Sequence, residues 1–336
     1  MTNYQFIKPK IVAHSEIVVC LFDYCNLRCT FCPQDHQSMI GASREEILAK
    51  VATINNWINF QSTSPVVKIH LMGGELFQDT LIERGFLDIY DELISQVKEG
   101  VKPGRKIIFN FITNLVFKKT TEVKAFLKKN QLKLSVSYDS AGRFNHYQRN
   151  LFSENIKVFS SEIELVSCVM TRENMHALTH GDELFDELYQ QFTCDWDHFL
   201  PSVTNSQQMM PSESETFAFY KLLVDRYPEC LNVRNFVEAG ESHKMTCTRG
   251  NSLTIMRDGS IPAGCSGSIF LKDPMTKDLG SEKIVENFLT KYNCFECQFY
   301  KRCPFTCFIK NDYKHTVRDM EKCVFKSVFE YVEEKN

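Results

Sequence analysis

The sequence predicts an α/β protein: a partial (β/α)6 barrel of the TIM type, followed by a small cysteine-rich domain. Over the first two hundred residues, short β-branched or aromatic runs alternate with amphipathic stretches, a pattern typical of a parallel sheet covered by helices. A βα unit takes about 30 residues, so the span from Val18 to Val203 holds six units and not the eight of a closed barrel. Beyond Met245, seven of the 14 cysteines lie among short, turn-rich segments.

Strands are predicted at residues 18–23, 66–72, 107–113, 132–139 and 163–170, with a weaker one at 197–203. Between them, Ser43 followed by Glu46 predicts a capping box at the start of a helix. Three amphipathic helices are expected from their apolar faces. These faces are Ile47, Val51, Ile54 and Ile58; Leu81, Phe86, Ile89, Leu93 and Val97; and Leu184, Phe185, Leu188 and Phe192.

The predicted domain boundaries follow changes in composition. Residues 1–205 are assigned to the barrel and residues 245–336 to the cysteine-rich domain. Between them, residues 206–244 form a bridging region, in which a stretch rich in Ser, Asn, Gln and Pro precedes a helix at 215–227.

Charge and hydropathy exclude several classes of function. The formal net charge of −3 gives no electropositive surface for nucleic acid. No apolar run reaches the roughly 20 residues that cross a bilayer, and residues 1–20 lack a secretion signal. A protein of the reducing cytoplasm is therefore predicted, where clustered cysteines indicate metal or redox sites rather than disulfides.

Three cysteines crowd onto one loop directly after the first predicted strand. Cys25, Cys29 and Cys32 lie within eight residues. A four-iron cluster normally takes four thiolates, so three would leave one iron open to a small chelating molecule that receives an electron. The alternatives are buried inert thiols or a zinc site, although zinc sites generally pair cysteines two by two and no partner pair is nearby.

This loop resembles the CX3CX2C signature of the radical SAM superfamily, in which an aromatic residue, here Phe31, precedes the last cysteine. The resemblance implies that Cys25, Cys29 and Cys32 bind a [4Fe–4S] cluster whose fourth iron is chelated by S-adenosyl-L-methionine (SAM). Reductive cleavage of SAM would then yield a 5′-deoxyadenosyl radical.

Gly73, Gly74 and Glu75 follow the second predicted strand, at the carboxyl end where parallel sheets place their ligands. Glycines allow close backbone approach, and a carboxylate there can bind an ammonium group. Alone, such a run is usually a turn. Beside the cysteine loop it is similar to the family's GGE element, which implies that Glu75 binds the amino group of SAM.

The fourth predicted strand ends in residues 135–142, a stretch similar to the family's S-x-D-G element except that Ser140 stands where glycine is frequent. The resemblance implies that Ser137 contacts the ribose or carboxylate of SAM, with Arg149 as a further carboxylate partner. Both could instead make ordinary surface hydrogen bonds. Asp139 is the candidate acid or base, with turn capping as the alternative. Other acid–base candidates are Asp23, His70 and His146.

The seven later cysteines fit zinc poorly, since a zinc ribbon uses four. Their spacing resembles the SPASM extension of radical SAM enzymes, including its CX2CX5CX3C core, so the resemblance covers nearly the whole chain. It implies two auxiliary clusters, and hence three [4Fe–4S] clusters in all. One would be held by Cys247, Cys265 and Cys307, and the other by Cys294, Cys297, Cys303 and Cys323.

The first auxiliary set is one ligand short. Glu241 and His243 occur where relatives often supply a thiolate, and Cys230 is a distant candidate. We expect an open or non-cysteine position. Three cysteines remain: Cys20 and Cys168 are predicted to be small buried hydrophobes, and the role of Cys194 stays open.

The predicted chemistry is hydrogen-atom abstraction, for which the protein holds the target carbon close and excludes water and dioxygen. Most SPASM relatives modify peptides, which implies cross-linking, dehydrogenation or epimerisation of a ribosomally made peptide. No additional terminal domain for a leader peptide is expected, since Cys25 and Cys323 lie near the ends. Pro33 departs from the aromatic residue frequent in peptide modifiers, so a sugar, aminocyclitol or nucleoside substrate is the alternative.

An electron donor such as flavodoxin or ferredoxin completes the predicted system. A non-enzymatic multi-zinc interaction protein is the remaining alternative. The colour of the purified protein separates the enzyme from the zinc protein. Three four-iron clusters would give a brown, oxygen-sensitive protein with about ten to twelve irons, whereas a zinc protein would be colourless.

Overall fold

The computed structural model describes residues 14–32, 34–141, 143–198, 207–237, 251–262, 289–300, 302–303 and 323–335. The chain divides into two units, which we describe separately. The first comprises residues 12–167 and 251–262, and the second comprises residues 1–11, 168–250 and 263–336. The domain bounds predicted from composition stay a prediction.

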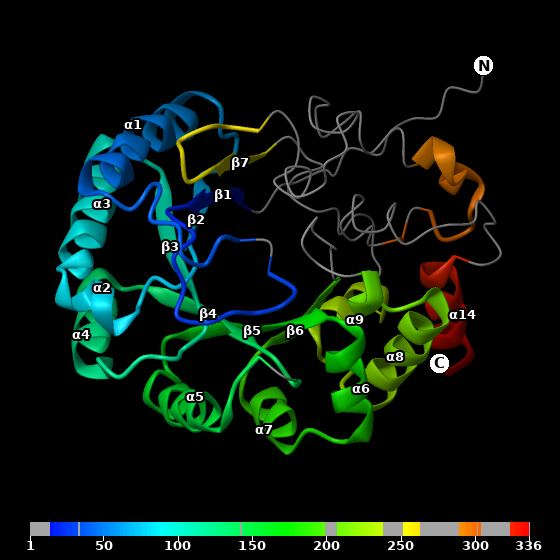
Figure 1. The fold of residues 1–336 in the computed structure, drawn as a ribbon. Coiled ribbons are helices and arrows are strands. Elements are labelled where there is room, and N and C mark those ends of the chain that lie inside the picture. The colour runs from blue at the N-terminus through cyan, green and yellow to red at the C-terminus, as the bar shows by residue number, and fades with distance from the viewer. Residues whose placement is uncertain are drawn as a thin grey trace. The chain divides into compact units, whose positions relative to one another are not determined.

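Seven parallel strands form one curled half-barrel sheet in the order β6-β5-β4-β3-β2-β1-β7 (Figure 1). Six of them follow chain order, so the predicted α/β partial barrel is confirmed. The strands are β1 (Ser15–Cys20), β2 (Val66–Met72), β3 (Lys106–Thr113), β4 (Lys133–Tyr138), β5 (Ile163–Met170), β6 (Cys194–His198) and β7 (Ser252–Ile255).

Two strands begin three residues earlier than predicted, and one was not predicted for the barrel. β1 begins at Ser15 rather than residue 18, and β6 begins at Cys194 rather than residue 197. In β6, buried Cys194 and Trp196 alternate with more exposed Asp195 and Asp197, a period-two pattern that the apolar run further along obscured. β7 comes from the cysteine-rich part of the sequence and pairs in parallel with β1, Glu16 opposite Ser252.

The helices of the first unit lie on the outer side of the strands (Figure 1). The predicted capping box is present, since Ser43 Oγ accepts from Glu46 N at 3.2 Å and Glu46 accepts from Ser43 N at 3.1 Å. The second predicted apolar face is divided between α2 and α3, because Gly85 adopts a left-handed φ of 80° that interrupts the helix. The helices are α1 (Arg44–Phe60), α2 (Asp79–Glu83), α3 (Phe86–Gly100), α4 (Thr120–Asn130) and α5 (His146–Val158).

An aromatic core fills the space between β3, α3 and α4. The Phe77 ring stacks on Phe111 with centroids 5.2 Å apart, and Phe111 meets Phe126 edge-on at 5.6 Å. Tyr90 of α3 lies 5.8 Å from Phe111. Because Phe77 is fully buried, this core anchors the loop that carries Glu75 two residues earlier.

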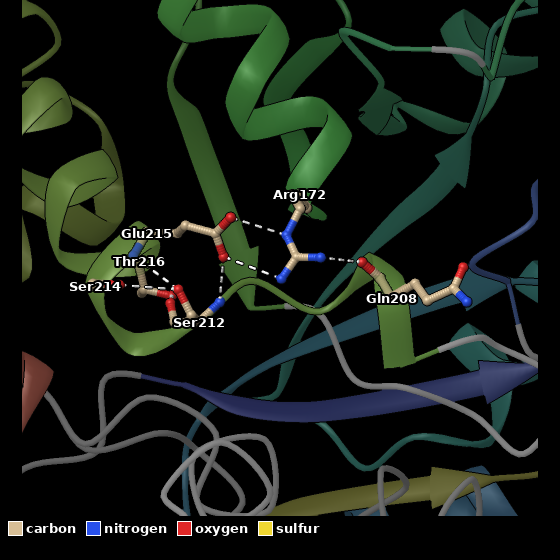
Figure 2. Close-up of polar contacts among 6 residues, drawn as sticks. All are labelled: Arg172, Gln208, Ser212, Ser214, Glu215 and Thr216. Carbon is tan, nitrogen blue, oxygen red and sulfur yellow. Dashed lines mark hydrogen bonds and ion pairs between the residues drawn. The ribbon is translucent and has the colours of Figure 1, made fainter.

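In the second unit, a charged network joins α6 to the start of α8 (Figure 2). Arg172 forms a bidentate pair with Glu215 at 2.9 and 3.2 Å and donates to the Gln208 carbonyl at 2.8 Å. The predicted helix at 215–227 is α8. The elements are α6 (Arg172–His180), α7 (Glu183–Gln191), η1 (Gln207–Met209), α8 (Glu213–Arg226), α9 (Leu231–Val237), η3 (Cys294–Glu296) and α14 (Val324–Lys335).

The C-terminal helix α14 packs its aromatic side chains against the rest of the second unit. Phe329 lies 5.0 Å from Phe236 of α9 and stacks at 4.8 Å on Phe299, which follows η3. Over the described ranges, none of the helices has the length and apolarity needed to cross a bilayer.

Candidate functional site

The cysteine loop is fixed to the Gly-Gly-Glu turn by backbone hydrogen bonds that extend the sheet. Three bonds of 2.8, 2.9 and 3.0 Å join residues 21–24 to residues 72–75, beyond the ends of β1 and β2. The two sequence motifs therefore lie side by side at the carboxyl end of the strands. This is the end at which parallel α/β sheets bind their ligands.

Gly74 is required by this close approach. A Cβ atom at Gly74 would lie 2.2 Å from the carbonyl oxygens of both Asp23 and Tyr24, and one at Gly73 would lie 2.8 Å from a methyl group of Leu76. Carbonyl groups cannot move aside as a flexible side chain does. The glycines thus let the chain before the cysteine loop contact the chain before Glu75.

The three thiols of the loop gather in one small cluster. Cys25 and Cys29 are buried, 7% and 8% exposed, and Cys32 is half-buried beside them. Burial, together with the nearby Glu75 carboxylate and the other two thiols, raises the pKa of the Cys25 thiol to about 12. Burial likewise raises the pKa of Cys32. Each thiol therefore lies within electrostatic range of the others.

The donor set fits a four-iron cluster better than a single metal ion. Within the described part of the chain, no three His, Cys, Asp or Glu side chains are arranged around one ion. A four-iron cluster attaches each thiolate to a different iron, so its ligands need not converge on one point. A bound metal would also supply the positive charge that buried thiols need to ionise.

Arg143 brings a positive charge to this site, and sequence reasoning missed it. Its Nε donates to Cys29 Sγ at 3.1 Å and an Nη donates to the Ser137 carbonyl at 3.1 Å. The guanidinium also lies over the ring of Phe31, 5.3 Å from the centroid. Burial opposes its charge, but Cys29, Asp139 and Cys32 outweigh burial and raise its pKa.

Glu75 is buried, 1% exposed, and its carboxylate accepts three hydrogen bonds. The donors are Phe77 N at 2.9 Å, Thr113 Oγ1 at 2.9 Å and Asn114 N at 2.6 Å. Burial raises the pKa of Glu75, and these bonds oppose the rise. An ammonium group placed beside it would offset the cost of burying the charge.

Asn114 links the end of β3 to the cysteine loop, and it too was missed. Its amide donates to Asn26 Oδ1 at 3.0 Å and lies 4.0 Å from Cys25 Sγ. Asn26 in turn donates to the Val116 carbonyl at 2.6 Å. The sequence did contain a signal for Asn114, namely its position directly after a strand. The carboxyl ends of neighbouring parallel strands lie at the same edge of the sheet, so a polar residue there is a site candidate.

Ser137, Arg149 and Asp139, the candidates at and after the end of β4, each make a contact within the protein. Ser137 is half-buried, and its carbonyl accepts from Arg143. Arg149 donates to the Tyr138 hydroxyl at 2.9 Å. Asp139 is buried and accepts from Ala141 N at 3.0 Å, which is the turn-capping contact. These contacts leave the predicted roles of Ser137, Arg149 and Asp139 untested.

Ser140 lies next to Asp139 in the same turn. Its hydroxyl oxygen is buried and makes no hydrogen bond within the described residues. A buried hydroxyl normally has a partner, so this atom, between Asp139 and Arg143 in the chain, is available to a bound polar molecule.

Of the other acid–base candidates, Asp23 lies beside the cysteine loop and accepts from Asp35 N at 3.2 Å. Asp23 is buried and forms an ion pair with Arg257, just beyond β7. His70 lies within β2, and burial lowers its pKa. His146 is exposed at the start of α5. Of the three, Asp23 is closest in sequence to the loop, and its partner explains how a buried carboxylate is tolerated there.

The second cysteine group is partly described. Cys294 and Cys297 bracket η3, where Cys297 N donates to the Cys294 carbonyl at 3.1 Å. Burial, with smaller contributions from Cys323 and Cys297, raises the pKa of Cys294 to about 12, so these three thiols lie within electrostatic range of one another. Cys303 is half-buried in the same unit. The remaining candidates, Cys247, Cys265, Cys307, Glu241 and His243, lie outside the described residues.

The other cysteines are buried. Cys20 and Cys168 lie inside their strands, as predicted. Cys194 and Cys230 are both 0% exposed, and burial raises the pKa of both thiols. A neutral buried thiol behaves as a small hydrophobic group.

Comparison with known proteins places this fold. No family model matches the sequence, and no curated protein matches it either. Among solved structures, native anSMEcpe with bound AdoMet and the Kp18Cys peptide matches with a TM-score of 0.70 and 18% identity, over 96% of this chain and 98% of that one. A hexahistidine-tagged form of anSMEcpe with bound AdoMet gives a TM-score of 0.69 at 18% identity, over 96% and 97%.

A third match is Streptococcus suis SuiB bound to S-adenosylmethionine, with a TM-score of 0.52 and 16% identity, over 92% of this chain and 76% of that one. Both anSME and SuiB are radical SAM enzymes. The chain therefore has the fold of the radical SAM enzymes.

Proposed function

We propose that this chain is a radical SAM enzyme that generates a 5′-deoxyadenosyl radical and abstracts a hydrogen atom from a peptide. The observation that carries the proposal is the gathering of Cys25, Cys29 and Cys32 at the carboxyl end of the sheet, hydrogen-bonded through the backbone to the turn that holds Glu75. The shared fold with enzymes that bind AdoMet supports it.

Cys25, Cys29 and Cys32 would hold the first cluster. A [4Fe–4S] cluster bound there would supply the electron that splits SAM into methionine and a 5′-deoxyadenosyl radical. The protein contributes a buried, largely apolar surround, since Phe31 and Phe144 cover the thiols. Excluding water and dioxygen in this way protects reactive species from side reactions.

Glu75 would bind the amino group of SAM through its ionised carboxylate. Three protein donors already orient this carboxylate, so the ammonium group meets a preorganised partner. Ser137 and Arg149 would bind the ribose or carboxylate, as the resemblance implies. The unpartnered Ser140 hydroxyl supports a polar ligand in the same place. Asp139 stays the candidate acid or base. Gly73 and Gly74 would let the bound SAM approach the backbone closely.

A peptide is the proposed substrate class, and its modification would be oxidative. The support is the peptide bound to anSMEcpe, a protein whose structure this chain shares over nearly its full length. The alternative substrate is a small molecule such as a sugar, aminocyclitol or nucleoside. The electron donor, flavodoxin or ferredoxin, and the cytoplasmic location stay predictions.

Cys294, Cys297, Cys303 and Cys323 would hold an auxiliary cluster. The mutual electrostatic effects among three of these thiols support it. Cys247, Cys265 and Cys307 are proposed for a further cluster on the resemblance alone, which brings the number of [4Fe–4S] clusters to three.

The proposal is tested by cleavage of SAM. The protein is reconstituted anaerobically with iron and sulfide, reduced with dithionite and incubated with SAM, and 5′-deoxyadenosine is measured by chromatography. We expect product from the wild type, none from Cys29→Ala, and wild-type product from Cys168→Ala, which removes a buried thiol outside the site. A colourless wild type that binds zinc, or undiminished product from Cys29→Ala, would refute it.

The substrate class needs a separate measurement. If a short open reading frame beside the gene encodes a candidate peptide, that peptide, uniformly labelled with deuterium, should transfer deuterium into 5′-deoxyadenosine. Transfer from a deuterated sugar or nucleoside, and none from the peptide, would favour the small-molecule alternative.

A further inference from the structure

The three loop sulfurs receive unequal hydrogen bonds. Cys29 Sγ accepts from the Arg143 guanidinium at 3.1 Å. Cys25 Sγ accepts from the backbone N–H of Leu27 at 3.4 Å and lies 4.0 Å from the Asn114 amide. Among these bonds, the charged donor therefore reaches Cys29, whereas the donors to Cys25 are neutral. The Arg143 charge also lies within electrostatic range of Cys32.

Arg143 is held in this position from three sides besides the sulfur. Its Nη1 donates to the Ser137 carbonyl at 3.1 Å. The guanidinium carbon lies over the rings of Phe31 and Phe144, 5.3 and 5.9 Å from their centroids. Cation–π contacts and a backbone acceptor fix a planar guanidinium that cannot lose its charge. The side chain is therefore preorganised beside Cys29.

A fixed charge beside a thiolate ligand acts on electron transfer. A reduced iron–sulfur cluster carries one more negative charge than the oxidised cluster, so a nearby cation stabilises the reduced form. Hydrogen bonds to the sulfurs act in the same direction, and both are known determinants of cluster potential. The effect is strong where the charge is shielded from water, and Arg143 is half-buried.

We propose that Arg143 is a positioning residue that, through Cys29, raises the reduction potential of the cluster bound by the Cys25–Cys29–Cys32 loop, so that a cellular donor can reduce it. This inference rests on the proposed function. The step is a one-electron reduction in which the reductant is oxidised, the cluster is reduced, and no bond or proton changes.

The test is a redox titration of the reconstituted holoenzyme with dithionite, followed by electron paramagnetic resonance. The signal of this cluster is identified by its change when SAM is added. We expect Arg143→Met to lower the ratio of reduced to oxidised cluster about tenfold at a fixed potential, which is about 59 mV for one electron. Arg143→Lys, which keeps the charge but not the planar fork, should fall between this variant and the wild type.

Arg28→Met is the matched control. Arg28 lies in the same loop and is exposed, and its guanidinium donates to the backbone carbonyl oxygens of Cys25 and Leu27 and not to a sulfur. Removing this charge should leave the potential unchanged. An equal shift in Arg28→Met, or a wild-type potential in Arg143→Met, would overturn the inference.

If Arg143→Met takes up no cluster, the inference is tested by the reduction potential of the cluster in Arg143→Lys, which should lie below the wild-type value. Loss of the cluster from both variants would make Arg143 a structural part of the loop and would also overturn the inference. A wild type without any iron–sulfur signal would instead refute the proposed function, and this is seen before the variants are compared.

Discussion

Replacing Gly74 with alanine tests the contact between the two motifs. The added methyl group would lie 2.2 Å from two backbone carbonyl oxygens, whereas ordinary contacts begin at 3.4 Å. The chain segments must therefore separate by about 1 Å. That shift would stretch the bonds from Gly74 N to Phe22 O and from Glu75 N to Tyr24 O, now 2.9 and 3.0 Å, beyond hydrogen-bonding distance.

The expected cost follows from these two effects. Overpacking costs about 1–3 kcal/mol, and each lost backbone hydrogen bond about 1 kcal/mol. We therefore expect Gly74→Ala to lower the free energy of unfolding by about 3–5 kcal/mol, a large part of the total for an ordinary domain. Urea unfolding of the metal-free protein, followed by circular dichroism, measures this directly.

Gly104→Ala is the comparison variant. Gly104 has a φ of +90°, and no atom lies within 4 Å of its hypothetical Cβ. Its replacement should cost only about 1–2 kcal/mol of backbone strain, without loss of iron. A Gly74→Ala protein that is as stable as Gly104→Ala, and that still binds iron and SAM normally, would refute the argument from close approach.

Three further predictions concern charge and metal. Because burial raises the pKa of Glu75, ionising this carboxyl opposes folding, and the free energy of unfolding of the metal-free protein should fall as pH rises above about 4.5. In Glu75→Gln this fall with pH should be absent. Urea unfolding measured across this pH range would contradict the prediction if the free energy of unfolding fell equally in both proteins. Arg257→Met should lower the free energy of unfolding by about 1–3 kcal/mol, because buried Asp23 would lose its ion-pair partner. The cost stays in this range because the Arg257 side chain is 38% exposed and therefore partly screened by water. An unchanged urea midpoint would disprove this prediction. Cys294→Ala should remove about four irons per chain, measured by elemental analysis, and unchanged iron would exclude Cys294 as a ligand.

The sheet and the two main motifs could be predicted because their signals are local. β2 and β5 have the predicted bounds, since apolar residues, many of them β-branched, recur at every second position or more often in each. The Cys25 loop and Glu75 were brought together by a general rule, that ligands gather at the carboxyl ends of parallel strands. No side-chain contact had to be known for that step.

The missed features depend on contacts that the sequence does not encode locally. β7 has four residues and pairs with β1, more than 230 positions earlier, so its role in the sheet could not be inferred from periodicity. Arg143 reaches Cys29 across 114 positions, and a loop conformation decides whether Arg143 or Arg149 points at the sulfur. Asn114 follows a strand directly, and the same carboxyl-end rule could have identified it.

The central claim is that the cluster held by Cys25, Cys29 and Cys32 has an iron open to SAM. Electron–nuclear double resonance of the reduced holoenzyme with SAM labelled with 15N in its amino group tests this most directly. The account predicts a hyperfine coupling between the cluster spin and that nitrogen, which disappears in Cys29→Ala. A wild-type cluster whose spectrum shows no coupling to the labelled nitrogen would contradict it.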